Sequence, residues 1–126
     1  MTGIKAPEQI SAEVKQFSKK KNKLKYKKRA LVKDIADAIT DRLLRLYEAQ
    51  KQPASFEDWL GSCFEYDTYS AFSIFKRDSV LKQLVDDIVE IDYQLKEDVA
   101  ILVNASLKDL GYNRGVHRHL NDVARI

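Results

Sequence analysis

The chain has 126 residues, enough for one domain with a hydrophobic core of its own. Hydrophobic residues make up 44% of the sequence and aromatic residues 10%, which excludes the composition typical of a disordered chain. Four glycines and two prolines interrupt it, and so few helix breakers favour long helices over many short strands.

Membrane and secreted classes are not favoured. The longest apolar run extends from Val99 to Val103, far short of the ~20 residues of a membrane span. The N-terminal residues lack the apolar segment of a secretory signal. Cys63 is the single cysteine, so no disulfide can form within the chain. We therefore expect a cytoplasmic protein, or a nuclear one in a eukaryote, with no membrane partner.

The net charge of +3 conceals an uneven distribution. Between Lys15 and Lys33 there are ten lysines or arginines and no acidic residue, whereas residues 34–126 contain 11 basic and 17 acidic residues. Basic segments of this kind often bind polyanions. The sequence therefore predicts a basic N-terminal arm at residues 1–29, whose continuity with the next helix is left open, and a helical domain at residues 30–126.

Residues 7–51 have helical patterning. Pro7 followed by Glu8 is typical of a helix start. Hydrophobic residues then recur every seven positions, at Ile10, Phe17, Leu24, Leu31 and Ala38. The positions four residues after the first four of these are Val14, Lys21, Lys28 and Ile35, so half of them are lysine. The pattern allows one long helix whose central turns cannot bury a full face. A clearer helix covers about residues 29–51, with an apolar stripe of Leu31, Ile35, Ile39, Leu43 and Leu46. Pro53 predicts its end.

Seven aromatic residues lie between positions 56 and 75. Ser55 and Asp58 have the spacing of a helix-capping motif, and two short helices are expected at about 56–64 and 68–76. Aromatic side chains bury the largest areas in a small core, so we interpret this stretch as core. The alternative is a face that binds a partner, because Trp and Tyr are enriched at binding hot spots.

A long helix is expected at 79–110. Asp78 and Ser79 suit its start, and Gly111 suits its end. Its apolar stripe is Leu81, Leu84, Ile88, Ile91, Leu95, Val99, Leu102 and Leu110. A short C-terminal helix follows, with Val116, Leu120 and Val123 packing back. The predicted fold is all-α: four to five helices, two of them long and amphipathic, short aromatic-rich helices between these two, and a basic N-terminal helical arm.

The basic segment is the candidate binding site. A polyanion would relieve repulsion among its lysines, and counterion release drives phosphate binding. Lysine outnumbers arginine nine to one in Lys15–Lys33, which favours phosphate contact over base reading. Tyr26 or Phe17 is a candidate for stacking on a base. The predicted nucleic-acid-binding residues are Lys15, Lys19, Lys20, Lys21, Lys23, Lys25, Tyr26, Lys27, Lys28, Arg29, Arg114 and Arg118. The alternative is a solvated arm, or a nuclear-localisation-like address.

Catalytic and metal sites are not expected. Cys63 with His117 or His119 lacks any nucleophile motif, and the two histidines point to nearly opposite sides of a helix. Their arginine neighbours instead suggest a weaker basic patch. The acids of helix 79–110 are interpreted as a solvated face: Asp86, Asp87, Glu90, Asp92, Glu97 and Asp98. No phosphate loop or dinucleotide motif occurs, so no enzyme and no cofactor is predicted.

The favoured function is a non-enzymatic nucleic-acid-binding accessory or regulatory protein, with a lysine-rich helix on the phosphates. The alternative is a protein-interaction module, an adaptor or inhibitor, that uses the aromatic stretch 56–75 or the acidic face of helix 79–110. DNA and RNA are not distinguished by the sequence, and homo-oligomerisation stays open. The two functions differ in salt dependence, since phosphate binding weakens steeply with salt.

Overall fold

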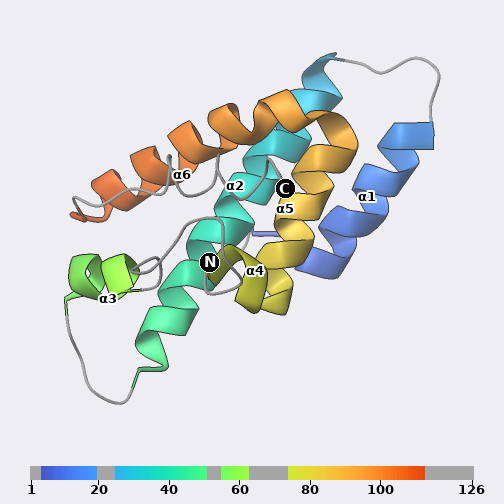
Figure 1. Cartoon of the computed structure of the whole chain (residues 1–126). Helices are drawn as coiled ribbons and strands as arrows, with labels where there is room; N and C mark the ends of the chain where they lie inside the picture. The colour runs from blue at the N-terminus through green and yellow to red at the C-terminus, as the bar shows by residue number, and fades with distance from the viewer. Residues whose placement is uncertain (1–3, 20–24, 51–54, 63–73, 113–126) are drawn as a thin grey trace.

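A computed structural model describes residues 4–19, 25–50, 55–62 and 74–112 (Figure 1). These residues form six α-helices, a 3₁₀ turn and no strand. The elements are α1 (Pro7–Lys19), α2 (Lys25–Glu48), α3 (Phe56–Ser62), α4 (Ile74–Arg77), α5 (Ser79–Asp92), η1 (Tyr93–Leu95) and α6 (Lys96–Asp109). The predicted all-α class is confirmed.

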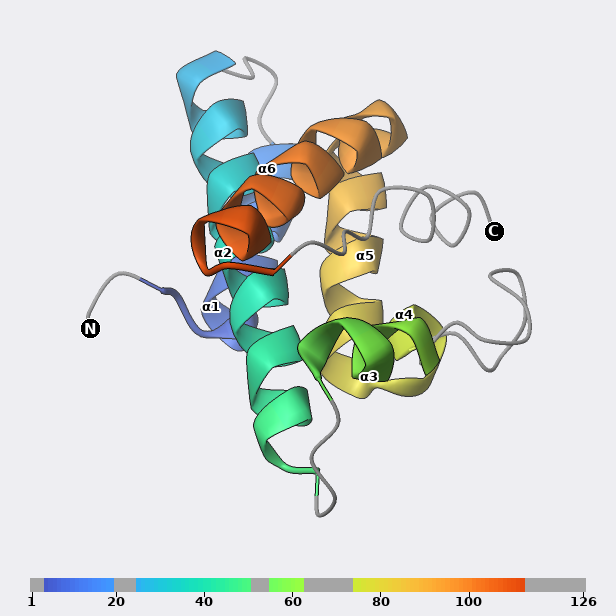
Figure 2. The same cartoon turned by 90° about the vertical axis from the view of Figure 1, so that its left-hand side faces the viewer.

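Helix α2 lies in the middle of the bundle (Figures 1 and 2). It packs against α6, α5 and α1, and α1 also packs along α5. Four of the five residues in its predicted stripe are buried: Leu31, Ile35, Ile39 and Leu43. Leu46, one turn further on, is partly buried against the same core. The apolar spacing of this helix therefore predicts its packed face correctly.

Helix α1 is part of the core. Ile10, Val14 and Phe17 are buried among the side chains of α2 and α5. The pattern allows a single helix through residues 7–51, but the structure has two separate helices, and α1, which ends at Lys19, packs against α2. The lysines in the middle of the predicted seam offer no apolar face there, whereas packing α1 on α5 buries the apolar positions that remain. Residues 7–19 of the predicted basic arm thus contribute to the core of the domain.

The single helix expected at 79–110 is also wrong. The chain leaves α5 at Asp92, passes through the tighter turn η1, and continues as α6 across α2 (Figure 2). The Asp92 carboxylate accepts a hydrogen bond from the backbone N–H of Gln94 at 3.0 Å. Such local side-chain bonds compete with regular helix. An unbroken helix would be about 48 Å long and would extend beyond the core. The turn instead brings α6 onto α2.

The turn also changes which residues of α6 are buried. The face against α2 consists of Val99, Ala100, Val103 and Leu107. Leu102 and Leu110, which belong to the predicted stripe, are 39% and 55% exposed. The prediction extended the helical phase of α5 through residues 93–95, whereas a 3₁₀ turn advances by about 120° per residue instead of 100°. Leu102 and Leu110 are therefore assigned to the wrong face, whereas Val99 of the same stripe is buried as predicted.

Local signals place the helix ends. Ser55 Oγ accepts a hydrogen bond from the backbone N–H of Asp58 at 3.1 Å, so the predicted cap of α3 is confirmed. Gly111, at φ = 92°, ends α6 in the left-handed conformation. The backbone N–H of Tyr112 then reaches the carbonyl of Leu107 at 3.0 Å. This hydrogen bond places the Tyr112 ring over Phe56, with the centroids 4.3 Å apart.

The aromatic residues that the structure describes support the core interpretation. Phe56 and Phe75 are each 1% exposed, and Tyr47 and Trp59 pack around Phe56. Phe64, Tyr66, Tyr69 and Phe72 lie outside the described residues. So do Cys63 and the C-terminal helix expected beyond residue 112.

Asp78 joins α5 to α2. Its Oδ2 accepts the backbone N–H of Leu81 at 3.0 Å, which caps α5 as predicted. Its carboxylate also accepts two hydrogen bonds from the guanidinium of Arg42, at 2.7 and 3.0 Å. Burial opposes the charge on Asp78, but the bonds from Arg42 and the backbone amides outweigh it and lower its pKa.

Asp78→Ala should lower the free energy of unfolding by about 2 kcal/mol, because the cap of α5 is lost and the Arg42 guanidinium loses the acceptor of two hydrogen bonds. Urea unfolding followed by circular dichroism measures this effect. Asp86→Ala is the control, since Asp86 pairs with Lys82 at an exposed position and its loss should cost under about 0.5 kcal/mol. Equal losses in the two variants would show that Asp78 contributes neither as cap nor as partner.

Asp87 departs from the predicted solvated acidic face. It is 4% exposed and lies between α5 and α1, where its carboxylate accepts hydrogen bonds from Ser11 Oγ at 2.8 Å and Gln83 Nε2 at 3.2 Å. Burial raises its pKa above 3.8, and these two bonds only partly offset the rise. The charges that act on it most are Asp86 and Lys15.

A raised native pKa means that the folded protein binds this proton more tightly than the unfolded chain. The stabilising contribution is therefore complete below pH 3.8 and is lost as the pH rises through the native pKa of Asp87. We expect the wild type to gain stability relative to Asp87→Asn as the pH falls from 7 toward 4, measured by urea unfolding at each pH. A difference that does not vary with pH would contradict this assignment.

Candidate nucleic-acid interface

Seven of the twelve predicted site residues are described by the structure. Lys15 and Lys19 lie on α1, and the others occupy the first turns of α2: Lys25, Tyr26, Lys27, Lys28 and Arg29. Lys20, Lys21, Lys23, Arg114 and Arg118 lie outside the described residues. The last turn of α1 and the first turn of α2 are at the same end of the bundle (Figures 1 and 2). The fold therefore brings Lys19 and the cations of α2 to one end of the molecule.

The two aromatic candidates for base stacking, Phe17 and Tyr26, differ in solvent exposure. Phe17 is 5% exposed and belongs to the core, so its assignment as a stacking residue is wrong. It faces α2 because it continues the α1 stripe begun by Ile10 and Val14. Tyr26 is 65% exposed and stands between Lys25 and Lys27. Only Tyr26 presents a ring that a base can reach.

Ion pairs divide the cations into two groups. Lys28 Nζ lies 3.4 Å from Asp92 Oδ2, and Lys33 Nζ lies 3.0 Å from Asp37 Oδ2. In contrast, no ion pair to another described residue involves Lys15, Lys19, Lys25, Lys27 or Arg29. All five are exposed. This set, hereafter the unpaired cations, can approach a phosphate without first breaking a salt bridge to a described residue.

Asp92 is a residue that the sequence did not single out for this region. Hydrogen bonds from the backbone N–H of Gln94 and from Lys28 hold its pKa below the ordinary value despite some burial. The carboxylate is therefore charged at neutral pH and neutralises Lys28. Asp92 is the last residue of α5 and lies sixty-four positions after Lys28 in the sequence, so only the tertiary fold reveals this pair.

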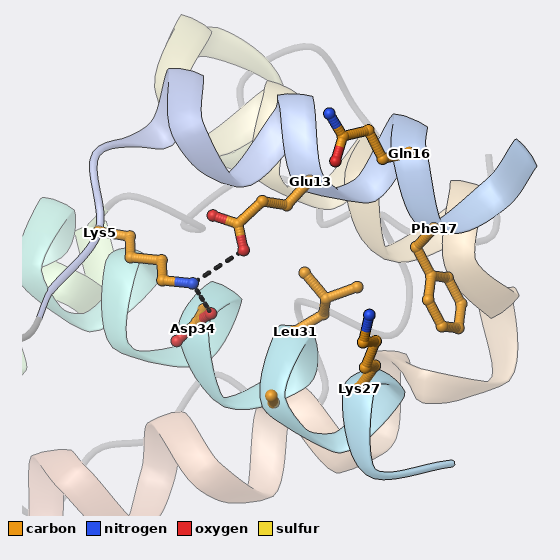
Figure 3. Close-up of a pocket in the computed structure, with 8 residues that line it drawn as sticks. Lys5, Glu13, Gln16, Phe17, Lys27, Leu31 and Asp34 are labelled. Carbon is orange, nitrogen blue, oxygen red and sulfur yellow. Dashed lines mark hydrogen bonds and ion pairs between the residues drawn. The ribbon is translucent and has the colours of Figure 1, made fainter. Parts of the chain in front are cut away.

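A cleft of about 210 Å³ separates α1 from α2 beside the unpaired cations (Figure 3). Lys5 reaches across it, with its Nζ 2.8 Å from Glu13 Oε1 and 3.1 Å from Asp34 Oδ2. Hydrogen bonds to these two carboxylates raise the pKa of Lys5. Lys27 lies in the same cleft, near Phe17 and Leu31 (Figure 3). Lys5 offsets one of these two negative charges, so Lys5, Glu13 and Asp34 together remain net acidic beside Lys27.

On the other side of α2, a groove of about 460 Å³ runs between the start of α2 and α6. Val32, Leu95, Ile101 and Leu102 supply its apolar lining. Its charged lining consists of Lys25, Lys28, Arg29 and Asp98. The sequence did not predict this groove, since it placed Leu102 on the buried stripe. We refer to it as the α2/α6 groove.

The remaining candidate sites receive less support. Within the described ranges no group of three His, Cys, Asp or Glu residues is arranged to hold a metal ion. Cys63, His117 and His119 lie outside these ranges. No helix among the described residues is long and apolar enough to cross a membrane.

No protein-family model matches the chain, and neither a curated protein nor a solved structure shows significant similarity to it. The charge, exposure and packing of the chain's own residues are therefore the basis for a function.

Phe17→Ala should lower the free energy of unfolding by about 3–5 kcal/mol, because it opens a cavity between α1 and the core. Tyr26→Ala should change it by less than about 0.5 kcal/mol, because the ring is solvated. Thermal or urea unfolding of the two variants tests the division. Comparable losses would contradict the separation of Phe17 from the exposed surface.

Proposed function

We propose that the protein is a non-enzymatic nucleic-acid-binding protein, accessory or regulatory in role, that contacts phosphates through the unpaired cations. The observation that carries the proposal is the concentration of these five exposed charges around the end of α1 and the start of α2. By sequence, Lys20, Lys21 and Lys23 add three more charges between them. Neutralising several phosphates releases counterions and gives binding that depends on salt.

The position of the charges on α2 adds a second physical reason. The first turn of α2 contains no acidic residue and begins with Lys25. Cations at the positive end of a helix dipole are unfavourable, and neighbouring lysines repel one another. A phosphate placed there would be attracted by the lysines and by the helix end together. An anionic ligand would therefore stabilise the folded protein as well as bind it.

The chemistry of the cations favours backbone contacts over sequence reading. Four of the five unpaired cations are lysines, which act as point charges, while Arg29 alone offers a bidentate fork. Lys28 contributes less because Asp92 already neutralises it. Tyr26 is positioned to stack on an unpaired base, which would favour single strands. We expect weak sequence preference and strong dependence on salt.

A protein-interaction module is the second candidate. An interface formed by the aromatic stretch 56–75 is less favoured, because Phe56 and Phe75 are buried. The acidic face of α5 and α6 remains, and the α2/α6 groove favours a protein partner independently of it.

A cytoplasmic or nuclear location remains an expectation from the sequence.

The decisive variant is the triple substitution Lys15→Gln, Lys19→Gln and Lys27→Gln. These three lysines do not line the α2/α6 groove, so the variant tests phosphate binding separately from the groove. Each phosphate contact contributes about 0.9 to the slope of log affinity against log salt on duplex DNA, so three lost contacts should reduce the slope by about 2.7. Fluorescence anisotropy with a labelled duplex DNA and a labelled single-stranded RNA, over a salt series, measures the slope.

The matched control is Lys33→Gln, Lys82→Gln and Lys108→Gln, which removes the same charge from exposed positions elsewhere. Equal affinity in the two triple variants, or no binding by the wild type at low salt, would refute the proposal. Truncation before Ala30 is not a suitable test. It removes Ile10, Val14 and Phe17 from the core along with the lysines.

A further inference from the structure

We propose that the α2/α6 groove binds an acidic amphipathic helix of a partner protein. The groove has an apolar floor formed by Val32 of α2, Leu95 of η1, and Ile101 and Leu102 of α6. Ile101 is 52% exposed and Leu102 is 39% exposed. A singly exposed aliphatic residue needs no explanation, but here two adjacent ones share a concave surface with two further apolar side chains.

The exposure of Ile101 and Leu102 follows from how α6 packs. The helix uses Val99, Ala100, Val103 and Leu107 against α2, so the residues between these positions face outward. The floor therefore rests on two helices that pack directly against each other. A third helix laid along the seam of two packed helices can bury apolar residues spaced three and four apart.

Charge complementarity identifies the occupant. Lys25, Lys28 and Arg29 line the α2 side of the groove, and Asp98 is the acidic residue of its lining. Asp92 pairs with Lys28, which leaves Lys25 and Arg29 to meet an incoming charge. A helix with an apolar stripe and carboxylates along one edge would match the floor and the α2 side together. The chain's own segments 20–24 and 113–126 carry net positive charge, so they do not match.

Other ligand classes fit less well. Among the described residues that line the groove there is no aromatic ring on which a nucleobase could stack. A small anion would leave the apolar floor uncovered, and small-molecule sites usually enclose most of their ligand's surface. The half-exposed Ile101 and Leu102 show instead an open groove of the kind that a helix covers.

The inference goes beyond the proposed function, and its central residues are different. Ile101 and Leu102 carry no charge and are not phosphate contacts. Lys25 and Arg29, however, belong both to the groove and to the unpaired cations. An acidic helix and a nucleic acid would therefore compete, and the partner would act as a regulator of nucleic-acid binding.

The probe is a fluorescein-labelled synthetic peptide of about 15 residues, with leucines at helical spacings of three and four and glutamates elsewhere. The test variant is Ile101→Gln with Leu102→Gln, and the control is Val89→Gln with Leu110→Gln, which are exposed hydrophobics outside the groove. We expect the test variant to weaken peptide binding by about tenfold or more and the control by less than about twofold. Circular dichroism and thermal unfolding check that both variants fold.

Two further arms test charge and shape. Arg29→Glu should weaken binding of the peptide, whereas Lys108→Glu, an exposed charge reversal at the other end of α6, should not. A peptide with lysine in place of glutamate, and a scrambled peptide of the same composition, should both bind more weakly by about tenfold. Competition is read by adding the glutamate peptide to the complex with labelled RNA, which should release the RNA.

The groove assignment is overturned if the peptide does not bind, if the test and control variants bind it equally, or if the lysine or scrambled peptide binds as well. It is also overturned if the test variant loses RNA binding while Lys15→Gln, Lys19→Gln and Lys27→Gln does not, since the groove would then belong to the nucleic acid. A dimer abolished by the test variant, seen by light scattering, would make a second copy the occupant. Failure of the lysine triple variant alone leaves the groove result intact.

Discussion

The turn at Tyr93–Leu95 positions α6 and thereby shapes both the basic end of the bundle and the α2/α6 groove. It redirects the chain so that α6 crosses α2, and its first hydrogen bond joins the Asp92 carboxylate to the backbone of Gln94. The same carboxylate pairs with Lys28 at the start of α2. One acidic residue thus ends a helix, lies beside the basic end of the bundle and removes one lysine from the set available to a ligand. With α6 placed in this way, Ile101 and Leu102 remain outside the core.

The placement of α1 has a complementary effect on the basic segment. Its apolar face fixes it to α5 and α2, and Lys5 joins Glu13 on α1 to Asp34 on α2. Partly solvated ion pairs of this kind contribute less to stability than apolar burial, so we expect the burial of Ile10, Val14 and Phe17 to hold the helix in place. The ion pairs matter for the electrostatic potential instead. Lys5 offsets one of the two nearby carboxylate charges and so weakens the acidic potential beside Lys27 and its neighbours.

Features that depend on a few neighbouring residues could be predicted from the sequence. The stripe from Leu31 to Leu43, the caps at Ser55 and Asp78 and the stop at Gly111 all follow from local rules of helix geometry. The break after Asp92 could not, because Tyr93 and Gln94 are ordinary helical residues and the apolar spacing continues through them. Burial of Asp87 depends on Ser11, and pairing of Lys28 depends on Asp92, both distant in the sequence. The basic segment was recognised by composition, but only its ion pairs separate the unpaired cations from Lys28.

Electrostatics would couple the two proposed binding surfaces through α2. Repulsion among Lys25, Lys27, Lys28 and Arg29, together with the helix dipole, makes the first turns of α2 unfavourable in the absence of an anion. Packing of α2 against α1, α5 and α6 holds this segment in helix despite that repulsion. Either a phosphate backbone or a row of partner carboxylates would relieve it, so each ligand stabilises the same folded segment by its own binding free energy. The two proposed ligands would nevertheless exclude each other, because Lys25 and Arg29 cannot neutralise both. The apolar floor at Ile101 and Leu102 would then distinguish the two ligands, because it favours the one that brings aliphatic side chains. Salt should weaken the binding of that ligand less than it weakens the binding of a phosphate backbone.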